Sequence, residues 1–106
     1  MVNNTSVDIR LPARFSPPEL LKIADIEWLV SIRLLQDGYD GAAITSAAAT
    51  VKTFACCTGL DSENDLVATA MTDLLANLMH LCQACDLPFC EVLSRAGEHF
   101  ENETGS

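Results

Sequence analysis

The fold is decided by residues 63–85, which read ENDLVATAMTDLLANLMHLCQAC. Apolar side chains recur in this stretch at spacings of three and four residues, which is the period of an amphipathic α-helix. They form a wide apolar face, and a face of that width predicts a central helix that packs against several neighbours. The apolar positions are Val67, Met71, Leu74, Leu75, Leu78, Met79, Leu81, Cys82 and Cys85.

Polar and helix-breaking residues stand at both ends of this stretch. At its start, residues 61–65 read DSEND and predict an N-cap at Asp61, with negative charge where the helix macrodipole favours it. After it, Leu87-Pro88 breaks the chain and predicts a further helix from Pro88 to about Asn102. The residues expected to face inward from that last helix are Phe89, Val92, Leu93, Ala96 and Phe100.

Two more helices are predicted upstream. Residues 42–58 are small and apolar, and Gly59 suits a C-terminal cap, although β-branched residues leave a strand as the alternative for part of this segment. Residues 16–19, Ser-Pro-Pro-Glu, have the pattern of a helix start with Ser16 as N-cap, and that helix is expected to reach about Gln36. Its expected inward face consists of Leu21, Ala24, Trp28, Ile32 and Leu35.

The predicted fold class is therefore all-α, a compact bundle of about four helices with an irregular or extended N-terminal arm. A chain of 106 residues has room for one domain, comprising an arm over residues 1–15 and a helical core over residues 16–103. Hydrophobic residues make up 49% of the chain, and a domain this small buries about two-thirds of its unfolded surface. Some of the apolar surface is thus expected to need a partner, and a homodimer is one candidate.

The charge balance narrows the classes of partner. Six Lys and Arg against fifteen Asp and Glu give a net charge of −9, which disfavours direct binding to nucleic acid. The same charge favours docking onto a basic protein surface, such as a nucleic-acid-binding groove. The alternative explanation of the net negative charge is that it keeps the protein soluble. No segment has the length and apolarity of a membrane span, no secretion signal is recognised and no cofactor is indicated, so the chain is expected in the cytoplasm.

The five cysteines are expected to be reduced core thiols. They are an odd number, so they cannot all pair within the chain, and they lie among apolar residues. Cys82-x-x-Cys85 lies inside a predicted helix and lacks a matching second pair, which argues against a structural zinc site. No metal is therefore assigned.

Three groups of polar residues are candidates for binding. Asp73, Asn77 and His80 follow the spacing i, i+4, i+7, which places them in one stripe of the predicted third helix. Such a stripe could bind a metal or a substrate if a neighbouring helix completed it, and otherwise it is a solvated edge or a buried hydrogen-bond network. The other two groups are the acidic residues Asp61, Glu63 and Asp65, and the polar residues Arg95, Glu98 and His99 of the last helix.

Two resemblances accompany these patterns. Residues 73–82, with Phe89 and residues 95–101, resemble small uncharacterised proteins of bacterial plasmids, phages and integrative elements, which implies a mobile-element origin. The helical hairpin with Asp73 is also similar to the MazG-like all-α nucleotide pyrophosphatases, which bind magnesium through E-x-x-E and E-x-x-D motifs. Asp73 matches the final aspartate of the second motif, but Ala70 stands where that motif has glutamate.

These observations predict a non-enzymatic interaction protein that binds and inhibits a host protein with a basic, nucleic-acid-binding surface, in the manner of an anti-CRISPR or DNA-mimic protein. Its acidity is spread along the chain and is not gathered into a catalytic pair of carboxylates. No catalytic residue is assigned. The alternative is a divergent MazG-like nucleoside triphosphate pyrophosphatase that uses Asp73.

Overall fold

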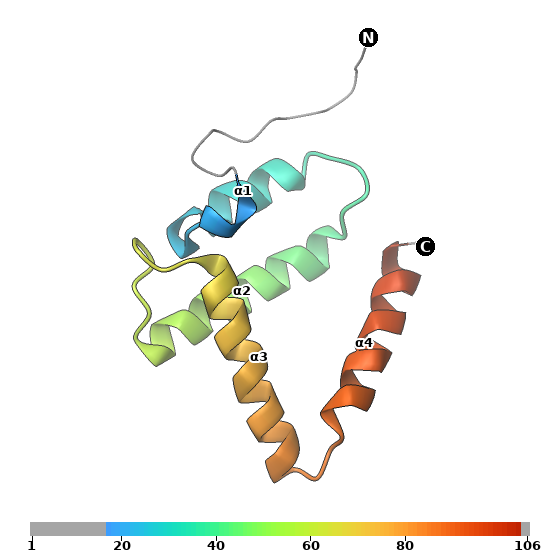
Figure 1. Ribbon diagram of the computed structural model, residues 1–106. Helices are drawn as coiled ribbons and strands as arrows, with labels where there is room; N and C mark the ends of the chain where they lie inside the picture. The colour runs from blue at the N-terminus through green and yellow to red at the C-terminus, as the bar shows by residue number, and fades with distance from the viewer. Residues whose placement is uncertain (1–16, 105–106) are drawn as a thin grey trace.

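The computed structural model describes residues 17–104, in which four α-helices follow one another without a strand (Figure 1). They are α1 (Ile26–Arg33), α2 (Gly41–Thr58), α3 (Val67–Ala84) and α4 (Phe89–Thr104). The predicted all-α class is confirmed for this part of the chain. The predicted arm over residues 1–15 and the predicted N-cap Ser16 lie outside the described residues.

The predicted first helix is wrong in its extent. Short 3-10 turns occupy Pro18–Leu20 and Ile23–Asp25, an extended pair of residues separates them, and α1 starts at Ile26. The physical reason is long-range pairing: the N–H of Ile23 donates to the carbonyl oxygen of Asp65 at 3.1 Å, and Val67 N–H donates to Leu21 O at 2.8 Å. Backbone groups that are bonded to a distant segment are not available for helical bonds.

The same pairing moves the start of α3. The N–H of Ala24 donates to the carbonyl oxygen of Ser62 at 2.8 Å, and Lys22 forms an isolated antiparallel bridge with Leu66. Residues 61–65 are therefore a loop joined to residues 22–24, and α3 starts at Val67 with Leu66 as an N-cap that makes no side-chain hydrogen bond. The prediction that Asp61 caps α3 is wrong.

Helix α2 is helical throughout, which decides against the strand alternative. Asp40 is its N-cap and accepts a hydrogen bond from the N–H of Ala43 at 3.0 Å. Gly59 is its C-cap with φ of 80°, in the left-handed region that glycine enters without steric cost. The predicted cap at Gly59 is confirmed.

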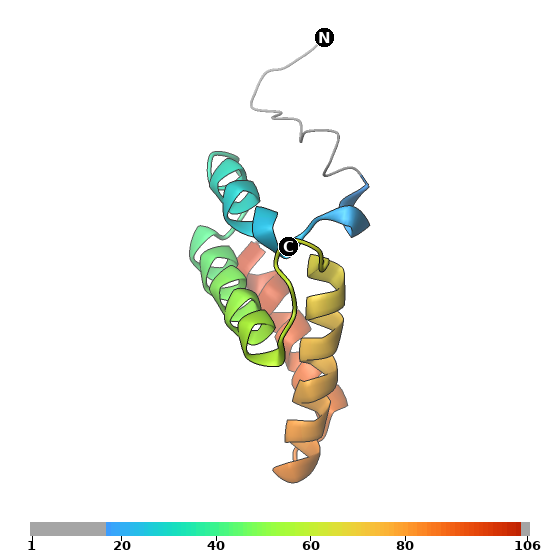
Figure 2. The same cartoon turned by 90° about the vertical axis from the view of Figure 1, so that its left-hand side faces the viewer.

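The packed core lies where α1 and its preceding turn meet α2 and the first turns of α3 (Figure 2). Because Ile23 and Ile26 fill it, the inward face expected for the first helix is wrong: Trp28 is 43% exposed and Leu35 71%. Small residues allow α2 and α3 to approach each other closely. The packed core consists of the buried residues Ile23, Ile26, Val51, Ala55 and Ala70, with Val30, Ala48, Leu60, Val67 and Leu74 packed against them.

Beyond this core, α3 and α4 form an open hairpin. Figure 1 shows the two helices joined at their lower ends and diverging from there. The turn contains Asp86 with φ of 58°, and Leu87 N–H donates to Cys82 O at 2.8 Å, which is the bond of a helix-ending Schellman motif. We call residues 71–104 the α3–α4 hairpin. No residue of α4 is buried, so the predicted inward face of this helix is wrong in the single chain.

Candidate functional site

The acidic residues 61–65 form a hydrogen-bonded turn. The Asp61 carboxylate accepts from the backbone N–H of Glu63 at 2.9 Å and from the side-chain amide of Asn64, while the Asp65 carboxylate accepts from Asp61 N–H at 2.6 Å. The backbone hydrogen bond from Glu63 and then the amide of Asn64 lower the pKa of Asp61, because both favour the charged carboxylate. Asp61 and Asp65 therefore shape this loop.

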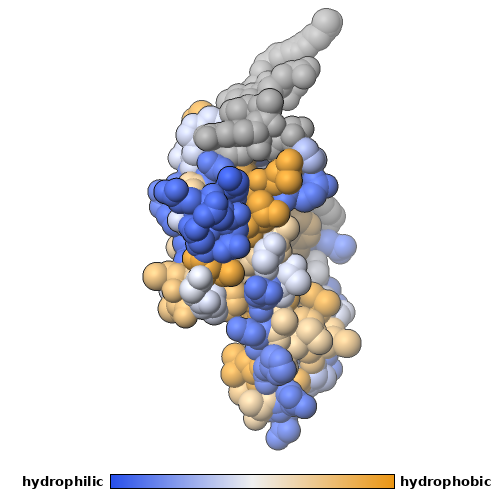
Figure 3. All heavy atoms as spheres, turned by 60° about the vertical axis from the view of Figure 1, so that its left-hand side comes forward, coloured by the Kyte–Doolittle hydropathy of each residue, from blue (hydrophilic) through white to orange (hydrophobic). Residues whose placement is uncertain are grey.

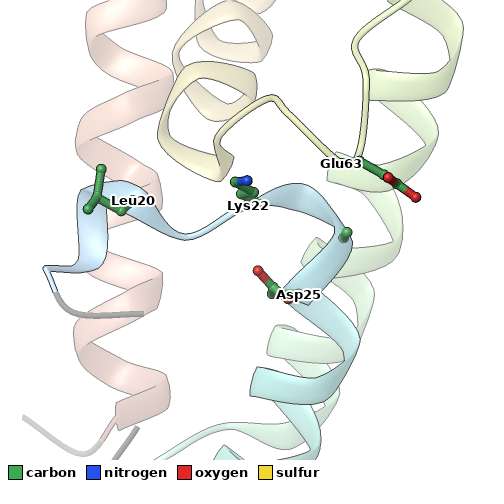
Figure 4. Close-up of a pocket in the computed structure, with 5 residues that line it drawn as sticks. Leu20, Lys22, Asp25 and Glu63 are labelled. Carbon is green, nitrogen blue, oxygen red and sulfur yellow. The ribbon is translucent and has the colours of Figure 1, made fainter. Parts of the chain in front are cut away.

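Glu63 lies at the rim of a shallow pocket formed where this loop meets the segment before α1. Figure 4 shows the side chains of Lys22, Asp25 and Glu63 around it, with the Glu63 carboxylate pointing away from Lys22 and Asp25. The pocket is lined by Leu20, Lys22, Ala24, Asp25 and Glu63. Because its charged groups diverge, this pocket does not assemble a binding constellation.

The predicted polar stripe of α3 is a solvated edge. Asp73, Asn77 and His80 are all exposed, and none of the three forms a side-chain hydrogen bond or ion pair with another described residue. The alternative of a buried hydrogen-bond network between helices is therefore wrong. A second shallow depression lies beside His80 and is lined by Ala76, Met79, His80 and Gln83, all from α3. No neighbouring helix contributes to it.

The polar residues of α4 are also exposed. Arg95 forms an ion pair with Glu91, one helical turn earlier, at 3.1 Å. Glu98 and His99 remain exposed on the same helix. Such an i, i+4 pair on a solvated helix contributes little to stability.

No metal centre is assembled in residues 17–104. Within this range, no group of three or more His, Cys, Asp and Glu side chains is placed to hold a metal ion. The residues that the sequence pattern offered for magnesium or zinc, among them Asp73, His80 and Cys82, are thus not brought together with further ligands. The described residues also include no helix of the length and apolarity that a membrane span needs.

The cysteines depart from the prediction in their burial. All five are free thiols, but Cys82 is the one that is buried, and the other four are exposed. The expectation of buried core thiols is wrong for these four because their helices present them to the outside of the packed core. The exposed thiols of the hairpin are Cys85 and Cys90, and those of α2 are Cys56 and Cys57.

The clearest feature of the molecule is its exposed apolar surface. Among residues 17–104, nine of the fourteen exposed large hydrophobic residues belong to the α3–α4 hairpin. Figure 3 shows apolar and hydrophilic atoms side by side on the lower part of one face, where the hairpin lies. The nine residues are Met71, Leu75, Leu78, Met79, Leu81, Leu87, Val92, Leu93 and Phe100.

Charge is distributed unevenly as well. Residues 61–104 include nine Asp and Glu but a single basic residue, Arg95. In the packed part of the chain, Lys52 pairs with Glu27 and thereby lowers the pKa of Glu27 through a hydrogen bond and charge attraction. Arg33 lies over the ring of Tyr39 at 5.6 Å. The hairpin, residues 71–104, therefore contains six of these nine acids together with nine exposed large hydrophobic residues.

Comparison with known proteins gives no independent guide to function. A scan against protein-family models, a search of curated proteins and a search of solved structures each find no match to this chain. The hairpin surface was not predicted as a site from the sequence, although its signal was present in the apolar pattern of residues 89–100 and in the small size of the domain.

Proposed function

We propose that this protein is a non-enzymatic interaction protein, carried by a mobile genetic element, that binds and inhibits a host protein at a basic, nucleic-acid-binding surface. The observation that carries the proposal is the charge of residues 61–104, nine acidic side chains against Arg95 alone. Since Arg95 is already paired with Glu91, the hairpin presents acidic groups without competing cations. Such a surface attracts a basic partner over long range.

The position of the acids in α4 supports a role in binding. Glu101 and Glu103 lie in the last turn of the helix, which contains no basic residue. The C-terminal end of a helix carries partial negative charge, so carboxylates there weaken the helix slightly. Helix stability therefore does not explain why carboxylates stand in the last turn of α4, whereas attraction of a basic partner does.

The test starts from a partner captured out of host lysate at low salt, which is then purified and titrated with the full chain. We expect the affinity to fall as salt rises and duplex DNA to compete for the same partner. The double variant Glu101→Gln/Glu103→Gln should weaken binding by about tenfold, since two exposed charges each contribute up to about 1 kcal/mol. An affinity that does not depend on salt contradicts the proposal.

The matched control is the double variant Glu19→Gln/Asp37→Asn, which removes the same charge from exposed positions outside the hairpin. Its affinity for the partner should stay within about twofold of that of the wild type if the position of the acids matters. If both double variants weaken binding equally, net charge alone explains the attraction, and the hairpin is not the binding surface.

The alternative function, a MazG-like nucleoside triphosphate pyrophosphatase, depends on Asp73. It predicts magnesium-dependent release of pyrophosphate that is lost in Asp73→Ala. The exposed position of Asp73, without a group of metal-ligating neighbours in the described residues, does not favour it. Absence of turnover with a panel of nucleoside triphosphates removes this alternative.

A further inference from the structure

Helix α4 has a continuous apolar stripe that the described chain leaves exposed beyond its first residue, Phe89, which is partly buried. The stripe consists of Phe89, Val92, Leu93, Ala96 and Phe100, whose spacings of three and four residues keep them on one side of the helix. Phe100 is 66% exposed, Leu93 54% and Val92 43%. This pattern is typical of a helix that packs along another helix over several turns.

Helix α3 presents a second stripe of the same kind. Met71, Leu75 and Leu78 follow one another at spacings of four and three, and they are 49%, 47% and 39% exposed. Because α3 and α4 diverge from their common turn, the two helices do not cover each other's apolar stripes along most of their length (Figure 1). The hairpin thus exposes two apolar helix faces, one on α3 and one on α4.

We propose that a second copy of this chain covers this surface, so that two α3–α4 hairpins pack into a four-helix arrangement around a two-fold axis. This inference is independent of the proposed function, since it depends on apolar side chains and not on charge. An interface around a two-fold axis uses the same patch on both copies, so the patch must be self-complementary. Each copy presents the same two apolar stripes, Met71, Leu75 and Leu78 of α3 and Val92, Leu93 and Phe100 of α4, so apolar side chains can face apolar side chains across the axis.

The exposed apolar area matches what a stable dimer needs. Large apolar side chains carry roughly 100 Å² each, so nine that are about half exposed offer on the order of 500 Å² per chain. A homodimer interface of standard size buries about 800 Å² per partner, of which about two-thirds, or roughly 500 Å², is apolar. Such an interface uses about 20–30 residues on each side, and the hairpin, residues 71–104, has 34.

Three charged residues of α4 lie away from the apolar stripe, whereas Glu103, three positions after Phe100, lies at the C-terminal end of the apolar side. Glu91, Arg95 and Glu98 lie on the side of the helix opposite Ala96 and Phe100, as their spacing requires. They stay in water when the apolar stripe is covered. Both copies are acidic, however, so they repel each other at low salt, and the dimer should become tighter as salt screens that repulsion. This is the opposite of the salt dependence expected for a basic partner.

The test is the mass of the full chain in solution, measured by sedimentation equilibrium over a range of concentrations and salt. We expect about 23 kDa, twice the 11.4 kDa of one chain, and a dissociation constant that falls as salt rises. The double variant Leu93→Lys/Phe100→Lys should raise the dissociation constant by at least about 100-fold. The matched control Leu20→Lys/Leu35→Lys, which changes residues 51% and 71% exposed outside the hairpin, should leave it unchanged.

Two results would overturn the proposal. One is a mass of 11.4 kDa at every concentration; if α4 amides are nevertheless protected from hydrogen exchange, another segment of the same chain covers the stripe. The other is a dimer that the hairpin variant does not weaken. If that variant loses its helical circular dichroism, the wild type still decides the question, because the melting temperature of a dimer rises with protein concentration.

Discussion

The packed core and the α3–α4 hairpin share one helix, yet they use it in opposite ways. In its first turns α3 buries Ala70 completely against α1 and α2, whereas Leu75 and Leu78 in its later turns remain about half exposed. The core is thus made from small and medium side chains, and most of the large apolar ones lie outside it. The difference shows that a strongly apolar helix is not buried by its own pattern, because burial requires a second surface within reach.

The largest expected effect on stability comes from a substitution in the packed core. Ile23 is 2% exposed, and Ile23→Ala should lower the free energy of unfolding by about 2–5 kcal/mol, since it removes buried methyl groups and leaves a cavity. The matched variant is Leu93→Ala in the hairpin. It should change the free energy of unfolding by less than about 0.5 kcal/mol in dilute protein. Urea unfolding measures both. Equal losses would show that the hairpin is packed within the single chain.

Two glycine substitutions should have smaller effects on stability, with opposite signs in the two regions. Gly59 has φ of 80°, so Gly59→Ala should cost about 1–2 kcal/mol by forcing a side chain into the left-handed region. Gly97 lies within α4, and a Cβ added there meets no atom within 4 Å, so Gly97→Ala should stabilise the chain by about 0.5–1 kcal/mol. Thermal unfolding in dilute protein measures both, and losses of the same sign would contradict this account.

The smallest effect concerns Asp61, in the loop that joins the two regions. Its pKa lies below the ordinary value of 3.8, so the loop is stabilised at pH values above that figure. As pH falls through the lowered pKa, protonation removes the stabilisation. Carboxyl-carbon NMR titration should show this low pKa, and Asn64→Ala should raise it towards 3.8 by removing the amide that donates to Asp61. An unchanged pKa in that variant would show that Asn64 makes no difference.

Where local patterns were sufficient, the sequence predicted the structure well. The last helix was predicted from Pro88 to about Asn102 and runs from Phe89 to Thr104. Helix α2 ends at Thr58 before Gly59, as expected. Both helices follow from periodicity and from residues that stop a helix, which act within a few positions of the chain.

The errors arose where distant residues compete with local ones. Leu21 and Ile23 bond to residues 65–67, more than forty positions away, and this pairing overrode the helix-start signal at Pro17 and the cap signal at Asp61. The polar stripe of Asp73, Asn77 and His80 was correctly placed on one helix, but its exposure depended on where the other helices lie. No single-sequence pattern contains that information.

By itself, the sequence determined that this chain is helical, acidic and richer in apolar residues than so small a domain can bury. These properties follow from composition and from local backbone preferences, which act without reference to the rest of the molecule. The tertiary structure alone decided which apolar residues are buried. Ile23 and Ala70 meet in the core because residues 21–24 pair with residues 62–67, while Leu93 and Phe100 stay exposed because α4 diverges from α3.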